Sequence, residues 1–125
     1  MMKIEKCKIA GILTLSWLIP VIVMVVGLRL LHVYPFGDRS YLGVDGVHQY
    51  LPFFAELWEK LHHGGGLFHS WNGGLGYDFW AVASYYLMCP LNLLVVCVKK
   101  TALIEAVTAL IICKTGLCGL SMSTA

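Results

Sequence analysis

Two uncharged runs of the sequence are long enough to cross a lipid bilayer, and they constrain the fold more than any other feature. The first extends from Ile9 to Leu28 and the second from Phe79 to Val98, and neither contains Asp, Glu, Lys or Arg. A helix of about 20 apolar residues spans the hydrocarbon core of a bilayer, which is roughly 30 Å thick. We therefore expect an all-α integral membrane protein.

The composition agrees with a membrane protein. Hydrophobic residues make up 58% of the chain and charged residues 13%, whereas soluble domains contain about 25% charged residues. The formal net charge is +2 and no basic run occurs, so the sequence indicates no nucleic-acid partner. The cysteines form no CxxC pair, and we interpret them as small apolar residues rather than as disulfides or a zinc site.

The apolar runs divide the chain into three predicted transmembrane helices, at 9–31, 79–98 and 101–125. Pro20 lies inside the first helix, and Pro90 predicts a bend or break in the second. A signal peptide is the alternative for the first run, but the apolar region of a signal peptide is usually about 7–15 residues long. The chain ends in an apolar segment, which predicts a fragment or a truncated gene product.

Lysine positions predict the orientation, because Lys and Arg concentrate on the cytoplasmic side of membrane proteins. Lysines precede the first run and separate the second from the third: Lys3, Lys6, Lys8, Lys99 and Lys100. We therefore expect residues 1–8 and the turn at 99–100 to be cytoplasmic and the loop at 32–78 to be external. The expected location is the bacterial cell membrane, with several spans and a cytoplasmic N-terminus.

The external loop contains a helix of its own. Apolar side chains recur at helical spacing with polar ones, Glu56 among them, largely between, which predicts an amphipathic helix at about 47–63 on the membrane surface. Pro52 fits best in a first turn, so the helix proper begins near Leu51. The glycines at 64–66 end it. The next segment, "LFHSWNGGLGYDFW", is rich in glycine and aromatic residues and predicts turns.

One carboxylate, Asp45, lies in the largely apolar and aromatic stretch "YLGVDGVHQYLPFF". Its simplest role is to cap the helix that follows, because an Asp in this position accepts a backbone N–H bond. At a membrane surface it can instead act as a general base. The residues alone favour capping, by a modest margin. The competing acid is Asp38, whose neighbour Arg39 favours a local turn or an ion pair.

A lysine in the last apolar segment also needs an explanation. Lys114 follows Glu105 by nine residues, which is about 13.5 Å along a helix, so it lies well inside the predicted span. A charge at that depth usually faces a partner or a polar cavity. We expect a partner such as an anionic lipid phosphate rather than snorkelling to the interface. Gly116, Gly119 and Ser123 predict close helix packing.

The histidines do not predict a metal site. Their spacing fits no zinc template and HEXXH is absent, so no metal ligand or cofactor is assigned and a divalent metal is not indicated. His48 lies about one helical turn from Asp45, and we expect the two side chains to share a site.

Several motifs together resemble the start of the bacterial YfhO-like membrane proteins. They are D-x3-QY within "VDGVHQY", the "WNGGLG" loop, P-x-N within "CPLN" and the segment "LIICKTGLCGL". The order of these motifs is fairly specific, and the resemblance covers about residues 29–121. YfhO-like proteins look like membrane glycosyltransferases of the GT-C class, which transfer a sugar from a polyprenyl-phosphate carrier to an acceptor outside the cytoplasm.

The resemblance implies a set of roles for this chain. Asp45 corresponds to the first-loop acid that serves as the base, or as a metal ligand in some members of the class. Arg39 or Lys114 corresponds to the cation that binds the leaving phosphate. Substrate contacts are expected from His48, Gln49, Trp71 and Asn72. The implied partners are the lipid bilayer, a polyprenyl-phosphate-linked sugar and an envelope polymer such as teichoic acid. The alternatives are a non-catalytic membrane module that binds or translocates lipid-linked precursors, or an inactive fragment.

Overall fold

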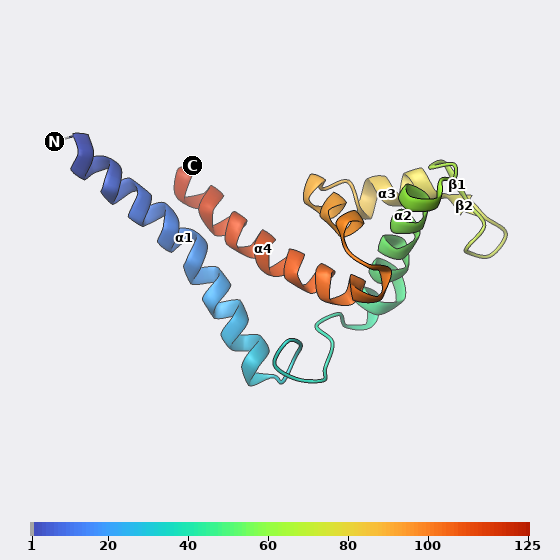
Figure 1. The fold of residues 1–125 in the computed structure, drawn as a ribbon, viewed down its shortest axis with the longest axis horizontal. Helices are drawn as coiled ribbons and strands as arrows, with labels where there is room; N and C mark the ends of the chain where they lie inside the picture. Colours follow the sequence, from blue (N-terminus) through green and yellow to red (C-terminus); the bar gives the residue numbers. More distant parts are fainter. Residues whose placement is uncertain (1) are drawn as a thin grey trace. The chain divides into compact units, whose positions relative to one another are not determined.

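The structure, a computed structural model, describes residues 2–125; the side chains of residues 1–7, including those of Lys3 and Lys6, lie outside the described part. The described residues are mostly helical, with one two-stranded sheet and connecting loops (Figure 1), which confirms the predicted all-α membrane class. It divides into two compact units: Met1–Tyr41 with Thr108–Ala125, and Leu42–Val107.

The first unit contains helix α1 (Met2–Leu30) and most of helix α4 (Leu103–Thr124). Two segments, Lys8–Leu30 and Lys100–Thr124, are long and apolar enough to cross a membrane. Leu28 is buried, but most of the large apolar side chains of the first segment are exposed and therefore available to lipid. Pro20 lies inside α1, as the sequence predicted.

Two glycines of α4 lie directly against α1. A Cβ atom added to Gly119 would lie 2.3 Å from the backbone oxygen of Ser16, and one added to Gly116 would lie 2.6 Å from the indole nitrogen of Trp17. Only glycine permits so close an approach of two helices. The predicted packing role of Gly116 and Gly119 is therefore confirmed, whereas Ser123 is exposed and its hydroxyl donates within its own helix.

The second unit is built around helix α2 (Leu51–His63). A π-helix, η1 (Gly46–Tyr50), precedes α2, so the two together cover the helix predicted at about 47–63. The α-helix begins at Leu51 with Pro52 in its first turn, as predicted. Gly64 ends the helix with a φ of 76°, a conformation that glycine adopts without strain.

A glycine-rich loop and a short hairpin follow α2. Strands β1 (His69–Ser70) and β2 (Tyr77–Asp78) pair antiparallel, with Ser70 opposite Tyr77. Asp78 caps the next helix, α3 (Phe79–Tyr86), because its carboxylate accepts from the backbone N–H groups of residues 80 and 81, at 3.0 and 3.3 Å. The ring of Phe79 is fully buried in the core of this unit, together with Phe54 and Leu57 of α2.

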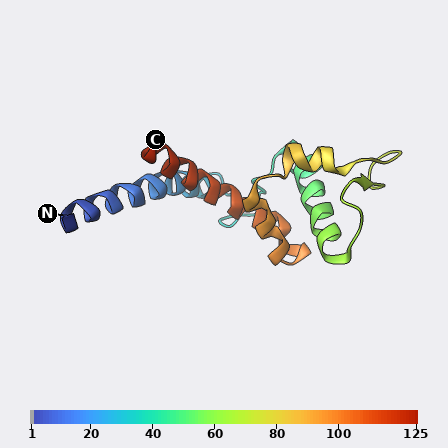
Figure 2. The same ribbon diagram turned by 90° about the horizontal axis from the view of Figure 1, so that it is seen from above.

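The second apolar run, predicted as a transmembrane helix at 79–98, forms two short helices. α3 is followed by the 3-10 helix η2 (Pro90–Cys97), and their axes differ by 108° (Figure 2). Pro90 is the first residue of η2. The buried side-chain amide of Asn92 donates to the backbone oxygen of Leu87 at 3.2 Å and so connects η2 to the end of α3 across the break. The predicted break near Pro90 is therefore seen. By length and composition the bent pair fits either a broken span or a re-entrant loop.

The end of this bent segment is bonded to α2. The indole N–H of Trp58 donates to the backbone oxygen of Val98 at 2.8 Å. The ammonium of Lys100, in the short 3-10 helix η3 (Lys100–Ala102), forms an ion pair with Glu59. Residues 98–100 therefore lie beside α2, and α2 is the helix that the sequence places outside the membrane.

These bonds predict the topology of the bent segment. Because Lys100 pairs with Glu59, we expect Lys99 and Gly65 to lie on the same side of the membrane. The lysine pattern instead predicts that the turn at 99–100 is cytoplasmic and that Gly65 is external. Gly65→Cys and Lys99→Cys, each in a background with native cysteines replaced by serine, can be treated with a membrane-impermeant maleimide on intact cells. Both positions should react, or neither. Labelling of position 65 alone would establish three spans with a cytoplasmic 99–100 turn.

The helix contact in the first unit gives a second prediction. Gly119→Ala places a methyl group against the backbone of Ser16, and overpacking of this kind costs typically 1–3 kcal/mol. We expect a lower melting temperature for the purified variant in detergent. Gly11→Ala is the matched control, because nothing lies within 4 Å of its added Cβ and alanine favours a helix. Equal melting temperatures for the two variants would contradict a packing role for Gly119.

Candidate functional site

The side chain of Lys60 binds the glycine-rich loop, residues 64–78, to α2. Its ammonium donates to the backbone oxygens of Gly66 and His69, each at 2.8 Å, and lies 3.6 Å from the Oε1 atom of Glu56. It also lies 5.0 Å from the centroid of the Phe79 ring. Only 12% of the Lys60 side chain is exposed, so these interactions form in a poorly solvated place. The lysine thereby joins α2, the loop and the start of α3.

Glu56 is a buried carboxylate in the middle of α2. Only 6% of the residue is exposed, and its Oε2 atom accepts the hydroxyl hydrogen bond of Tyr77 at 2.5 Å. Its Oε1 atom is buried, accepts no hydrogen bond within the described residues and has the Lys60 ammonium at 3.6 Å. The sequence places Glu56 among the polar residues of the amphipathic helix, and the structure buries it against Tyr77 and Lys60.

Tyr77 is held in place by the hairpin. It lies opposite Ser70, a buried residue whose hydroxyl oxygen accepts the backbone N–H of Asn72 at 3.1 Å. Burial, and then the hydrogen bond to Glu56, raise the pKa of Tyr77 above its ordinary value of 10.0. A raised pKa means that the folded protein retains this proton. The Tyr77–Glu56 bond is therefore fully present at neutral pH and is lost only as the pH rises through the folded-state pKa.

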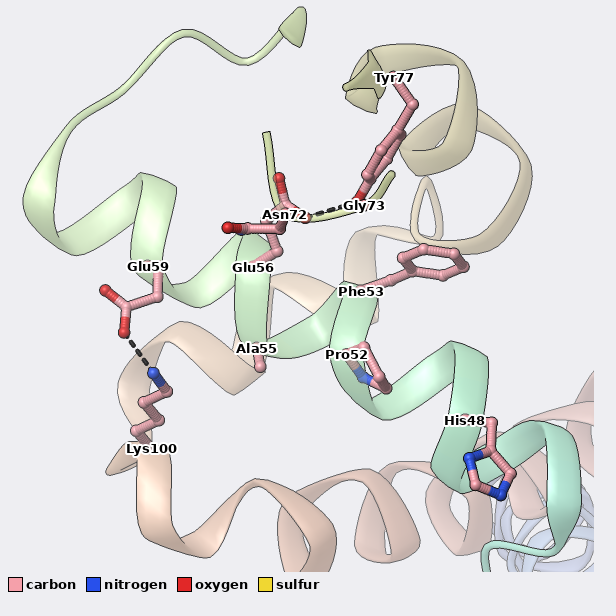
Figure 3. Close-up of a pocket in the computed structure, with 10 residues that line it drawn as sticks. All are labelled: His48, Pro52, Phe53, Ala55, Glu56, Glu59, Asn72, Gly73, Tyr77 and Lys100. Atoms are coloured by element: carbon pink, nitrogen blue, oxygen red, sulfur yellow. Dashed lines mark hydrogen bonds and ion pairs between the residues drawn. The ribbon is translucent and has the colours of Figure 1, made fainter. Parts of the chain in front are cut away.

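An open pocket of about 340 Å³ lies beside this pair, between η1, α2, the loop and Lys100 (Figure 3). The ring of Phe53 forms part of its wall, with its centroid 6.5 Å from that of the Tyr77 ring. The polar side chains that line the pocket come from four separate segments: His48, Glu56, Glu59, Asn72, Tyr77 and Lys100.

The ion pair between Glu59 and Lys100 closes one side of the pocket (Figure 3). The hydrogen bond from Lys100 is the main cause that lowers the pKa of Glu59 below its ordinary value of 4.5. A depressed pKa means that Glu59 remains ionised at neutral pH. The ion pair is therefore fully present above the ordinary pKa of a glutamate and is lost as the pH falls through the lowered pKa of Glu59.

The structure gathers some of the predicted substrate-binding residues and not others. His48 and Asn72 line the pocket, whereas Asp45, which was expected to share a site with His48, does not line it. Gln49 and Trp71 are their chain neighbours but do not line it, and both are exposed. Trp71 is 79% exposed and meets the ring of His69 edge-on, with centroids 4.5 Å apart.

Asp45 occupies the position just before η1, but it does not cap that helix. Its side chain makes no capping hydrogen bond, and its backbone is already helical, with φ −70° and ψ −29°. The carboxylate is exposed and lies three residues before His48 in the chain. The capping role that the residues alone favoured is therefore not the role seen, and Asp78 is the acid that caps a helix in this unit.

The other predicted residues belong to the unit that contains α1. Asp38 and Arg39 are exposed in a turn, where the backbone oxygen of Arg39 accepts from the N–H of Tyr34 at 2.8 Å. Lys114 lies near the middle of α4 and is half-buried. The roles of Arg39 and Lys114 toward a phosphate remain predictions. Among residues 2–125, no cluster of three or more His, Cys, Asp or Glu side chains has a geometry that holds a metal ion.

Sequence reasoning missed four residues of the site: Glu56, Glu59, Tyr77 and Lys100. One signal for them was present, because Glu56 and Lys60 have the four-residue spacing of a helical ion pair. The partners of Glu59 and Tyr77 lie 41 and 21 positions away, so no local pattern reveals them.

Comparison with known proteins identifies one family. The family described as "Bacterial membrane protein YfhO" matches residues 16–125, which include α2, the pocket and α4. No curated protein and no solved structure matches the chain. The family match confirms the resemblance drawn from the motifs.

The Lys60 contacts predict the order of the loop. In Lys60→Met the oxygens of Gly66 and His69 lose their donor, and Glu56 stays buried without its cation, a change that typically costs about 3–5 kcal/mol. We expect faster hydrogen exchange and faster proteolysis within 64–78. Lys99→Met is the control, because Lys99 is exposed in the same unit. Equal loop protection in both variants would show that Lys60 does not hold the loop.

Proposed function

Because the chain belongs to the bacterial membrane protein YfhO family, we propose that it forms the N-terminal part of a membrane glycosyltransferase. The enzyme transfers a sugar from a polyprenyl-phosphate carrier to a cell-envelope acceptor, such as a teichoic acid, outside the cytoplasm. The observation that supports this proposal most directly is Asp45, an exposed carboxylate beside the pocket-lining helix η1 that makes no capping bond.

Asp45 is the proposed general base. Its carboxylate accepts the proton of an acceptor hydroxyl as that oxygen forms a bond to the anomeric carbon of the sugar. The bond between the anomeric carbon and the carrier phosphate breaks, and the phosphate leaves with the electron pair. A base for this step needs a free lone pair, and the uncapped Asp45 carboxylate offers one.

The leaving phosphate requires positive charge, and two predicted residues supply the right chemistry. Lys114 carries its ammonium within a segment able to cross the membrane, where a charge normally faces a partner or a polar cavity. Arg39 is exposed and its guanidinium can bind a phosphate through two parallel hydrogen bonds. A lipid carrier with its tail in the bilayer presents its phosphate close to such residues.

Asp45→Asn tests this proposal. Asparagine keeps the size of the side chain but cannot accept the proton, and general-base catalysis contributes typically about 10²–10⁴-fold in rate. In the intact gene product we expect sugar transfer to fall by roughly that factor, with expression and membrane insertion unchanged. Transfer can be measured with membranes, a radiolabelled polyprenyl-phosphate sugar and envelope polymer.

Asp38→Asn is the matched control, because Asp38 is an exposed acid on the same loop but lies in a turn beside Arg39. It should transfer sugar at a near-normal rate. If Asp38→Asn loses transfer and Asp45→Asn does not, the base is Asp38. Normal transfer by both variants would refute a catalytic acid on this loop and leave a non-catalytic module that binds lipid-linked precursors.

A further inference from the structure

We propose that the pocket beside the Glu56–Tyr77 pair binds one neutral sugar ring, an inference that rests on the proposed glycosyltransferase function. The sugar belongs either to the lipid-linked donor or to the end of the acceptor polymer, since both present the same hydroxyl groups. Three properties of the pocket support a neutral sugar: its size, the hydrogen-bonding groups in its wall and its balance of charge.

The size fits a single ring. The pocket has a volume of about 340 Å³, near the lower end of the roughly 300–1,000 Å³ typical of small-molecule sites. The wall combines an aromatic face with polar groups. Phe53 and Tyr77 present rings set at 60° to each other, and a ring face suits the C–H side of a sugar.

The polar groups in the wall match hydroxyl groups, which both donate and accept hydrogen bonds. Glu59 offers acceptor oxygens, the Asn72 amide offers both a donor and an acceptor, and the Lys100 ammonium offers donors. Each of these side chains comes from a different segment, so a ring placed between them is met from several directions (Figure 3).

The charges in and beside the pocket cancel in pairs. Glu59 is paired with Lys100, and Glu56 has the Lys60 ammonium at 3.6 Å. An anionic ligand would meet two carboxylates, and a cation would have to compete with two ammonium groups that are already in place. A neutral ligand disturbs neither pair, which is why we assign a sugar ring rather than a phosphate to this pocket.

The wall is also fixed before any ligand arrives. Glu56 is more than nine-tenths buried and bonded to the Tyr77 hydroxyl, and the backbone of Asn72 is bonded to Ser70. Preformed polar groups bind a ligand without a cost for ordering them. His48 completes the wall from η1, three residues after Asp45, so the helix that lines the pocket directly follows the proposed base.

Binding of simple glycosides tests the proposal. The probes are the methyl glycosides of glucose, galactose and N-acetylglucosamine, with the methyl glycoside of glucuronic acid as the charged comparison. Binding can be followed by saturation-transfer NMR on the intact gene product in lipid nanodiscs, which avoids sugar-based detergents. We expect at least one neutral glycoside to bind and the glucuronide to bind more weakly.

Variants locate the binding. Asn72→Ala removes an amide from the wall, and Tyr77→Phe keeps the ring but releases Glu56; each should weaken neutral glycoside binding by roughly tenfold. Leu75→Ala is the control, because Leu75 lies in the same loop and is 98% exposed. The proposal is overturned if no neutral glycoside binds or if the glucuronide binds as tightly as the neutral glycosides. It is also overturned if the three variants bind the neutral glycosides equally well.

Asp45→Asn separates this proposal from the proposed function. It should lower transfer by roughly 10²–10⁴-fold while leaving glycoside binding intact, because Asp45 does not line the pocket. Glycoside binding with normal transfer in Asp45→Asn would overturn the catalytic proposal alone. In the transfer assay, a KM raised only for the lipid-linked sugar in Asn72→Ala assigns the pocket to the donor, and one raised only for the polymer assigns it to the acceptor. An unchanged KM for both would show that the pocket takes neither substrate.

Discussion

The arrangement of the Leu42–Val107 unit depends on the ammonium of Lys60. A glycine-rich loop has little side-chain surface with which to pack, so its position must come from its backbone. Lys60 binds two backbone oxygens of that loop and at the same time neutralises Glu56. The two interactions depend on each other. The Glu56 carboxylate can be buried only beside the Lys60 ammonium, and the loop that buries it is held in place by that same ammonium. Tyr77, at the end of that loop, then reaches Glu56 and completes the wall of the pocket.

A second constraint is the bend in the apolar run at 79–98. Pro90 removes a backbone donor and Asn92 bonds to Leu87, so the chain turns through 108° instead of continuing as a long helix. The turn returns Val98 and Lys100 to α2, where they bond with Trp58 and Glu59. A straight helix over 79–98 would extend about 30 Å at 1.5 Å per residue and would carry Lys100 away from Glu59. The bend is therefore what supplies the positive side of the pocket.

Much of the fold is predictable from the sequence because it depends on local patterns. The apolar runs, the start of α2 at Leu51, its end at Gly64, and the contact glycines of α4 follow from hydrophobicity, proline geometry and residue size. The site is predictable only in part. His48 and Asn72 were expected to bind substrate, but the burial of Glu56 and the pairing of Glu59 with Lys100 arise from segments that meet only in three dimensions. The sequence of a helix alone does not show which of its polar residues are buried, because the segment that covers them can be distant in the chain.

The carboxylates between residues 45 and 78 show how the same chemical group takes different roles. Asp78 accepts two backbone N–H bonds, Glu56 accepts the Tyr77 hydroxyl, and Glu59 is bonded to Lys100. Each of these acids accepts a bond of the fold through at least one carboxylate oxygen, and protonation of that oxygen would disrupt the bond. Asp45, which is exposed as Asp78 is, differs because its carboxylate makes no capping bond to the helix after it. A general base must gain and lose a proton in each cycle without disturbing the structure around it. Of these four acids, Asp45 is the one whose protonation breaks no bond of the fold, and this is the physical reason to propose it as the base.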